Sequence, residues 1–354
     1  MTGASGMLGH AVATALVARG DEVTTAQRRA SGVVGARDVR GSLDDAGVAA
    51  GAAAGVAAEV AARGAAGVVA GQEAEVVAGA VAGAVAGQDA VVHLAAKVSL
   101  TGSLAEFERT NIEGTRILLA AARAAGAKRF VMISSPSVAH TGTSIMGDGA
   151  GPARPERARG PYARTKAAAE LLALAADAPG FAVVAVRPHI VWGPGDTQLV
   201  QRVVDRAAAG RLPILDAGAA LIDTTYIDNA VGGIVAALGR AEQVHGEAFV
   251  VTNGEPRPVG EIIGAMCRAA GVVSPRWSVP GALARACGAA VETIWSLLPH
   301  PGEPPMTRFL AEQLSTAHWF DQRRTRERLG WTPTITLDEG FAQLTRYYHD
   351  RRMP

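Results

Sequence analysis

The chain opens with the stretch Thr2-Gly3-Ala4-Ser5-Gly6-Met7-Leu8-Gly9, a run of the form G-x-x-G-x-x-G. Glycines at this spacing allow a tight turn and let backbone N–H groups approach a pyrophosphate at the N-terminus of a helix. Residues 8–19 then carry apolar side chains at helical spacing, and residues 22–26 have the composition of a short strand. This order predicts a doubly wound α/β fold whose parallel sheet binds a dinucleotide.

The strand that should lead into the glycine turn is missing, because only Met1 and Thr2 precede Gly3. In a doubly wound sheet that first strand is central and pairs on both sides. We therefore expect that the true start lies upstream or that this chain is truncated. The alternative is a sheet with a gap at its middle, in which two neighbouring strands would leave backbone hydrogen-bonding groups unpaired.

The end of the second predicted strand bears on the choice of cofactor. An acidic residue about 20 positions after the glycines would bond the ribose 2′-OH of NAD. Gln27 holds that place here, and Arg28 and Arg29 follow it. A carboxylate would repel a 2′-phosphate and an arginine would bind it, so the sequence favours NADP(H) over NAD(H). The alternative is that the two arginines only solvate an exposed loop.

A tyrosine and a lysine lie four residues apart in Tyr162-Ala163-Arg164-Thr165-Lys166. Side chains at this spacing share one face of a helix, so the ammonium of Lys166 can lie near the phenol of Tyr162. A nearby cation favours the phenolate, and we expect it to lower the pKa of Tyr162 from about 10. A phenol adjusted in this way can exchange a proton while hydride moves to or from a carbonyl carbon. The alternative is an ordinary surface pair on a helix.

Further polar residues lie at predicted strand ends. Residues 129–133 form a predicted strand that ends at Ser134 and Ser135, whose hydroxyls can donate to a substrate oxygen; turn-forming serines are the alternative. Asn111 lies within a helix predicted over residues 104–125 and faces the same region.

The strand predicted at residues 89–96 ends in small side chains, which leave room for a cofactor. His93 within it could be a ligand or an acid, but a hydrogen-bonded histidine near the core is the favoured interpretation.

The composition excludes several classes of protein. A net charge of +1 gives no indication of a nucleic-acid partner. Cys267 and Cys287 are the only cysteines, which indicates a reducing compartment and so a cytoplasmic location. The N-terminus lacks the pattern of a signal peptide, and no uncharged run reaches the ~18 residues of a membrane-spanning helix.

The length of 354 residues suggests two structural units. Residues 1–186 are expected to form the dinucleotide-binding domain, with an Ala/Gly-rich low-complexity insertion at 46–87 to which we assign no chemistry. Residues 187–354 are expected to be mainly substrate-binding, with elements around 221–251 returning to the first domain. The stretch 279–299 is predicted to be a helix over the substrate site; a helix in weak contact with a membrane surface is the alternative.

Taken together, these motifs resemble the extended short-chain dehydrogenase/reductase family, also called the NAD-dependent epimerase/dehydratase family. The matching segments follow the family's order along most of the chain: Thr2–Gly9, Asp89–Ala96, Asn111 with Gly114-Thr115, Ser134-Ser135, Tyr162 with Lys166, Arg187-Pro188 and Tyr226-Ile227-Asp228. The resemblance implies a Rossmann-type sheet with a smaller C-terminal substrate-binding domain. It also makes a homodimer one candidate assembly.

The resemblance also implies roles for individual residues. Tyr162 would be the general acid/base and Lys166 its partner, Ser135 would hold the substrate oxygen, and Asn111 would support a water relay. Ser42 stands where the family often has an aspartate near the adenine. The residues implied to bind the cofactor are Gly3, Ser5, Gly6, Met7, Leu8, Gly9, Arg28, Leu43, Leu94, Ala95, Ala96, Tyr162, Lys166, Pro188, His189 and Ile190.

Within the family the chain is most similar to the 3β-hydroxysteroid dehydrogenase branch, on the basis of residues 187–196 and 315–333. Bacterial members of this kind include 2-alkyl-3-oxoalkanoate reductases. The implied activity is an NAD(P)-dependent interconversion of a secondary alcohol and a ketone on a bulky apolar 3-hydroxy or 3-keto small molecule. The alternatives are a nucleotide-sugar epimerase or dehydratase, a non-catalytic cofactor-binding protein, and a chain that is inert as written.

Overall fold

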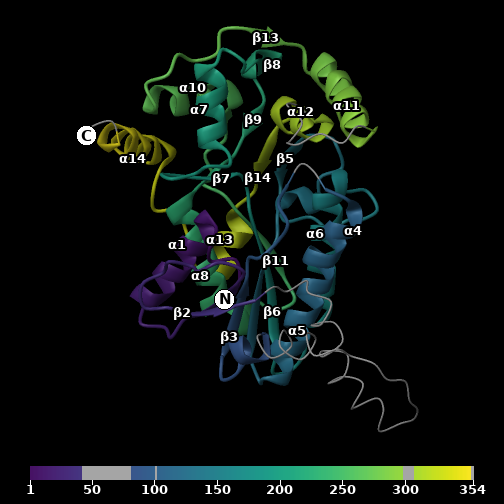
Figure 1. The fold of residues 1–354 in the computed structure, drawn as a ribbon, viewed down its shortest axis with the longest axis vertical. Helices are drawn as coiled ribbons and strands as arrows, with labels where there is room; N and C mark the ends of the chain where they lie inside the picture. The colour runs from purple at the N-terminus through teal and green to yellow at the C-terminus, as the bar shows by residue number, and fades with distance from the viewer. Residues whose placement is uncertain (42–80, 100–101, 298–306, 352–354) are drawn as a thin grey trace.

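The computed structural model describes residues 1–41, 81–99, 102–297 and 307–351. Leu43, Ser42 and most of the 46–87 insertion lie outside the described residues. A parallel sheet with the strand order β11-β6-β4-β3 forms the centre of the molecule (Figure 1). Its strands are β3 (Ala90–His93), β4 (Arg129–Ile133), β6 (Ala182–Pro188) and β11 (Ala248–Val251). Every residue of β6 is buried, as expected for a Val- and Ala-rich parallel strand covered on both faces.

Two more parallel strands, β1 (Thr24–Gln27) and β2 (Arg37–Arg40), continue the sheet beyond β3. Thr2 lies between β1 and β3 and forms isolated bridges with Ala26 and His93. Its N–H donates to Val92 O (3.0 Å), its carbonyl accepts from Leu94 N (3.3 Å), and Met1 O accepts from Ala26 N (2.8 Å). Residues 1 and 2 therefore occupy the position of the first strand. Their hydrogen bonds connect β1 to β3 at the point where the sequence predicted a gap in the sheet.

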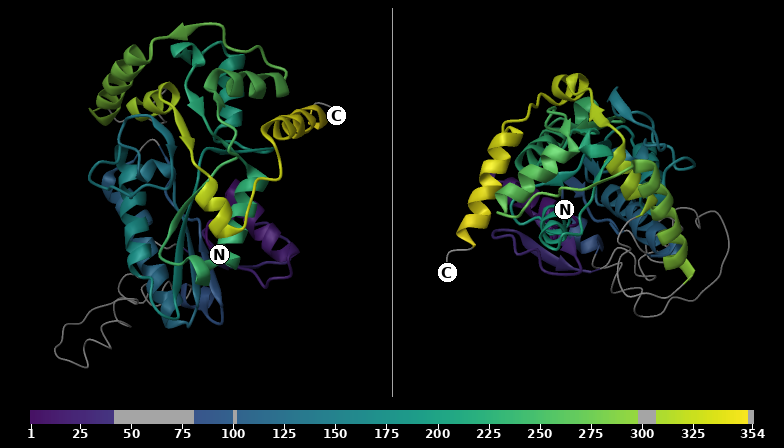
Figure 2. Two further views of the ribbon diagram at one scale, coloured as in Figure 1. Left: turned by 180° about the vertical axis from the view of Figure 1, so that it is seen from behind. Right: turned by 90° about the horizontal axis from the view of Figure 1, so that it is seen from above.

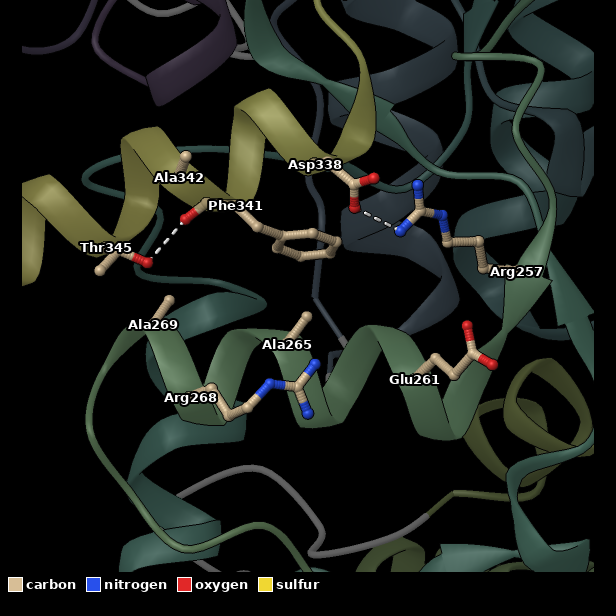
Figure 3. A pocket seen from close by; sticks show the side chains of 9 residues that line it. All are labelled: Arg257, Glu261, Ala265, Arg268, Ala269, Asp338, Phe341, Ala342 and Thr345. Atoms are coloured by element: carbon tan, nitrogen blue, oxygen red, sulfur yellow. Dashed lines mark hydrogen bonds and ion pairs between the residues drawn. The ribbon is translucent and has the colours of Figure 1, made fainter.

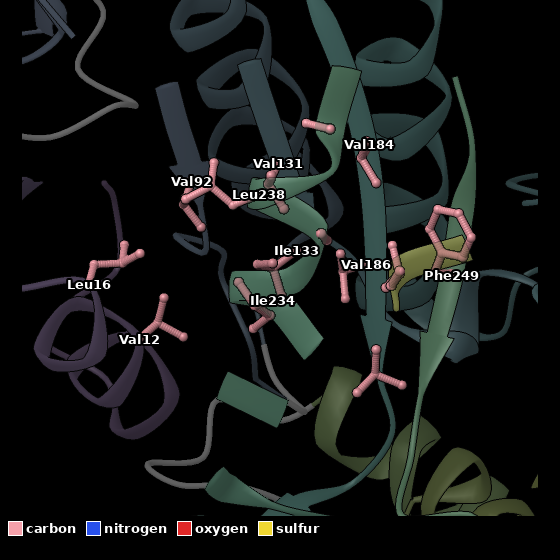
Figure 4. Packing of buried hydrophobic residues seen from close by; sticks show 14 of the residues in the cluster. Val12, Leu16, Val92, Val131, Ile133, Val184, Val186, Ile234, Leu238 and Phe249 are labelled. Atoms are coloured by element: carbon pink, nitrogen blue, oxygen red, sulfur yellow. The ribbon is translucent and has the colours of Figure 1, made fainter. Parts of the chain in front are cut away.

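Helices cover both faces of this sheet. On one face, α1 (Met7–Ala18) and α8 (Ile227–Gly239) pack together, and Val12, Leu16, Ile234 and Leu238 contact the valines of the strands (Figure 4). On the other face, α5 (Gly114–Ala124) and α6 (Gly160–Ala175) enclose a second buried cluster. This arrangement confirms the predicted α/β fold with a parallel sheet.

The helix predicted over residues 104–125 is not regular. It consists of α4 (Leu104–Phe107), a π-helical turn η1 (Glu108–Glu113) and α5. The wider turn contains the buried Asn111, whose side chain bonds to groups outside its own helix. Such π-bulges occur frequently at functional sites.

Most of the remaining elements gather at one end of the sheet, whereas α9 (Ala241–Val244) and α13 (Arg323–Leu329) pack against the parallel sheet and α8 (Figure 1). A small four-stranded sheet has the order β12-β9-β14-β5, and two pairs, β10-β7 and β13-β8, lie beside it. The strands are β5 (Ile145–Asp148), β7 (Val191–Trp192), β8 (Ile214–Leu215), β9 (Leu221–Ile222), β10 (Thr225–Tyr226), β12 (Arg257–Pro258), β13 (Ser278–Val279) and β14 (His318–Phe320). The helices and short turns are η2 (Pro136–Val138), α7 (Val200–Ala208), η3 (Asp216–Gly218), α10 (Val259–Ala269), α11 (Gly281–Leu297), α12 (Arg308–Ser315) and α14 (Leu337–Asp350).

A third hydrophobic cluster joins α7, α10 and α14 around Trp192. Figure 2 shows that α14 lies on the opposite side of this end from α11 and α12. Among the described residues, no helix has the length and apolar character needed to cross a lipid bilayer.

Candidate active site

Three predicted residues meet where β4 ends and α6 begins. Tyr162 lies in the first turn of α6, which starts at Gly160 with Pro161 in a position that suits proline. Lys166 lies one turn later with 2% of its surface exposed, and its Nζ donates to the carbonyl of Ile133 at 2.6 Å. Ser135 follows β4 by two residues, and its hydroxyl bonds to the phenol of Tyr162.

The electrostatics of this group differ from the prediction. Burial raises the pKa of Tyr162 to about 12, and only the hydrogen bond from Ser135 opposes this shift. The expected lowering of the Tyr162 pKa by Lys166 is therefore wrong for this structure, because burial dominates and the ammonium of Lys166 bonds to the Ile133 carbonyl. Burial also lowers the pKa of Lys166 to about 8, against the opposing effect of the Glu170 carboxylate.

Asn111 contacts the helix that carries Tyr162. Its Nδ2 donates to Thr165 Oγ1 at 3.0 Å, and its Oδ1 accepts from the backbone N–H of Lys97 at 2.7 Å. The Thr165 hydroxyl in turn donates to Pro161 O at 2.7 Å. Asn111 thus connects the π-helical turn, the segment after β3 and the first turn of α6.

The glycine turn packs too closely for a larger residue at two of its glycines, Gly3 and Gly9. Gly3 has φ +78°, and a Cβ there would lie 2.7 Å from Ala95 N. A Cβ on Gly9 would lie 2.1 Å from Gly3 O. Gly6 is the N-cap of α1 and provides no side-chain cap, so the first N–H groups of that helix are available to an anion.

Buried polar atoms near the strand ends also fit a dinucleotide. Neither amide atom of Gln27 nor the hydroxyl of Ser134 has a hydrogen-bond partner among the described residues. Gln27 ends β1 and Ser134 follows β4, so both lie at the carboxyl edge of the parallel strands, where ligands of such sheets bind. Arg28 and Arg29, after Gln27, are exposed.

The other residues expected near the cofactor lie at two strand ends. Leu94, Ala95 and Ala96 follow β3, and Ala95 N donates to the hydroxyl of Thr2. Pro188 ends β6. His189 after it is buried, with Nδ1 2.6 Å from Asp223 O, and Ile190 has a positive φ of 45°.

Ser5, Met7 and Leu8 lie in the glycine turn and the start of α1. His93 is a buried histidine, as favoured from the sequence, and its two ring nitrogens bond to the hydroxyls of Thr2 and Thr115.

An apolar cavity of about 370 Å³ adjoins Tyr162. Its walls come from the segments before α6 and after β6 and from α7, α10, α11 and α12, including Leu199, Ile263, Met266 and Leu310. Sequence reasoning did not find these residues, because they are scattered apolar positions brought together only by the fold. Glu292 of α11 is part of the wall, so this helix borders the cavity; that the helix lies over the substrate site stays a prediction.

A second cavity, of about 350 Å³, lies between α10 and α14 (Figure 3). It shares no lining residue with the cavity beside Tyr162, because it faces the other side of α10. Its most prominent polar contact is the ion pair between Arg257 and Asp338, at 2.6 Å.

Comparison with known proteins gives consistent results. A profile of the family described as "NAD dependent epimerase/dehydratase family" matches residues 1–252. The chain is 38% identical over 352 residues to a 2-alkyl-3-oxoalkanoate reductase of Stenotrophomonas maltophilia, a match that covers 97% of each chain. It is 33% identical over 267 residues to a protein of the same name from Shewanella oneidensis, covering 72% of this chain and 69% of that one.

A more distant relative is a 3-beta-hydroxysteroid dehydrogenase of Mycolicibacterium neoaurum, at 28% identity and 74% coverage of this chain and 75% of the other. Among solved structures, MoeE5 in complex with UDP-glucose and NAD superimposes with a TM-score of 0.68 at 21% identity, over 99% of this chain and 98% of that chain. At this identity the match establishes the fold alone.

Proposed function

The chain belongs to the NAD dependent epimerase/dehydratase family, and from this membership we propose the reaction it catalyses. Its relatives are reductases and dehydrogenases, and it is an oxidoreductase that uses a nicotinamide cofactor to interconvert an alcohol and a ketone. We propose that the substrate is bulky and apolar, of the 3-keto acid or 3β-hydroxysteroid type. The observation that carries this proposal is the apolar cavity with Tyr162 on its wall and Ser135 bonded to the Tyr162 phenol.

When bound, the nicotinamide supplies or accepts hydride at the carbinol carbon. Tyr162 gives its proton to the oxygen of the substrate, and Ser135 donates a hydrogen bond to the same oxygen. Because the pKa of Tyr162 is raised to about 12, the phenol carries its proton at neutral pH and is ready to act as an acid. Lys166 lies one helical turn away, with its ammonium bonded to the carbonyl of Ile133.

Charged groups on the cavity wall favour a keto acid over a neutral steroid. Arg159 and Arg206 both line the cavity, and neither guanidinium has an ion-pair or hydrogen-bond partner among the described residues. A substrate carboxylate would provide such a partner, often through two parallel hydrogen bonds. Glu292, on the same wall, already accepts a hydrogen bond from Arg308 N.

We also propose that NADP(H) is preferred to NAD(H). Support comes from the absence of a carboxylate at Gln27 and from the exposed guanidinium of Arg28 beside it. A cytoplasmic location and a homodimer remain predictions from the cysteine content and the family resemblance.

The proposal is tested by a rate screen with NADPH and NADH. The substrates are a 2-alkyl-3-keto acid, its methyl ester, a ketosteroid and a UDP-sugar. We expect NADPH oxidation with the keto acid, at a kcat/KM about 10- to 100-fold above that of the ester, since a charge-assisted hydrogen bond contributes about 1.5–3 kcal/mol. Arg159→Ala and Arg206→Ala should reduce this ratio. UDP-sugar conversion without net cofactor turnover would instead identify an epimerase and refute the proposal.

A further inference from the structure

A buried ion pair lies beneath α6, in a position that the reaction above does not use. The Glu170 carboxylate accepts two hydrogen bonds from Arg187, one from Nε at 2.8 Å and one from Nη2. The two side chains are only 1% and 2% exposed. Bidentate pairs of this kind fix the relative geometry of their partners as well as neutralising charge.

Arg187 also holds the loop that leads into α6. Its Nη1 donates to the carbonyls of Ala150 and Gly151, the latter at 2.9 Å. Farther along the same loop, Arg154 N donates to Val138 O at 2.9 Å, three residues after Ser135. Arg187 therefore connects three parts of the fold: its own strand β6, the helix that carries Tyr162, and the loop beside the serine.

Glu170 belongs to the same stripe of α6 as the catalytic pair. Tyr162, Lys166 and Glu170 follow one another at intervals of four residues, so they share one face of the helix. Lys166 is as buried as Glu170, and the Glu170 carboxylate raises the pKa of Lys166 against the lowering effect of burial. The carboxylate thus favours the charged form of an ammonium that the protein interior otherwise disfavours.

A buried ion pair need not stabilise a fold more than apolar residues of the same volume would. Stability alone therefore does not explain the pair. The two properties that bear on the site are the fixed orientation of the two side chains and the effect of their charges on neighbouring groups. We infer that Glu170 and Arg187 are positioning residues, which orient α6 so that Tyr162 meets Ser135 and which maintain the positive charge of Lys166. This inference rests on the function proposed above.

The test uses Glu170→Met/Arg187→Met, which replaces the pair with apolar side chains, because either single change would strand a buried charge. Glu170→Asp is the conservative variant. Arg257→Met/Asp338→Leu is a control at a more exposed position, since it removes the ion pair of the second cavity (Figure 3). Thermal melts establish which variants fold.

The first readout is the pH profile of kcat with the keto acid. We expect the double variant to lose about 10- to 100-fold in kcat, with KM for NADPH within about twofold, because a small misplacement of an acid costs about this much. The alkaline limb of its kcat–pH profile should move to lower pH, because Lys166 loses its proton more readily without the Glu170 carboxylate. Glu170→Asp should keep part of the kcat that the double variant loses. The control pair should change neither property.

The second readout does not depend on activity. The sequence contains only three lysines, Lys97, Lys128 and Lys166, so lysine labelled with ¹³C at Cε gives three NMR signals. The Lys166 signal is assigned with Lys166→Met. We expect its titration midpoint to fall by about one pH unit in the double variant. A folded double variant with an unchanged midpoint and an unchanged kcat profile would overturn the inference. A wild-type chain without turnover in the screen would contradict the proposed function, and the NMR titration would still decide the role of Glu170.

Discussion

Three of the four buried histidines in the described part of the chain should make the stability of this protein fall steeply in mild acid. His93 bonds to two hydroxyls, His189 to a backbone carbonyl, and His318 to His140 Nε2 at 3.0 Å. Burial lowers their pKa values to about 3, 4 and 3, respectively. A histidine whose pKa is lowered by folding contributes its full stability above the unfolded pKa of about 6.5 and loses it as the pH falls below that value.

The size of the effect follows from proton linkage. Between about pH 7.5 and about pH 5.5, each histidine binds its proton in the unfolded chain only, which reduces the free energy of unfolding by about 1.4 kcal/mol. Asp223 acts in the opposite direction, because burial raises its pKa to about 6. Its protonation in the folded state recovers about 1 kcal/mol over the same interval. The expected loss from these four groups is about 3 kcal/mol, a large part of the stability of a typical domain. Two further buried groups have lowered pKa values, the amino group of Met1 (about 5) and the ring of His140, and they add to the loss in the same direction.

Urea unfolding at the two pH values measures this loss directly. His318→Phe should remove about 1.4 kcal/mol of the pH dependence, because one proton-linked group is gone. The matched control is His349→Gln, at a histidine whose side chain is 70% exposed, and it should leave the pH dependence unchanged. A loss below about 1 kcal/mol in the wild-type protein, or equal effects of the two substitutions, would refute the assignment of neutral buried histidines.

Three further predictions concern the cofactor and the substrate oxygen. Ser135→Ala should lower kcat by about 10²- to 10³-fold with little change in thermal stability, as measured by initial rates and a melting curve, because it removes one hydrogen-bond donor to the developing charge. Gly9→Ala should lower the free energy of unfolding by about 1–3 kcal/mol and weaken NADPH binding in a fluorescence titration, since the new Cβ would lie 2.1 Å from Gly3 O. Arg28→Glu should reduce the NADPH-to-NADH ratio of kcat/KM by about 10-fold or more; an unchanged ratio would mean that Arg28 does not contact the 2′-phosphate.

The sequence was most informative where spacing along one element determines which residues meet. Tyr162 and Lys166 share a helix face because they are four residues apart, and Ser135 lies beside them because a predicted strand ends there. The glycine turn was predictable for the same reason, since the need for glycine at Gly3 and Gly9 is a local matter of backbone approach.

What the sequence could not predict depends on contacts between distant elements. Burial raises the pKa of Tyr162, and the spacing of residues along α6 does not reveal how deeply the phenol is buried. The partner of Lys166 is the carbonyl of Ile133, thirty-three residues away. The cavity walls come from several helices whose residue types indicate only that they are apolar. The π-helical turn at Asn111 likewise depends on bonds from its side chain to Lys97 and Thr165.

The central claim is that the phenol of Tyr162 is the proton donor in hydride transfer. The most direct measurement is NADPH oxidation by Tyr162→Phe under single-turnover conditions, with cofactor affinity measured on the same sample. We expect the rate to fall by about 10²- to 10⁴-fold while NADPH affinity is retained, because the ring stays and only the hydroxyl that carries the proton is lost. A near-normal rate in a folded variant that binds NADPH would contradict the account.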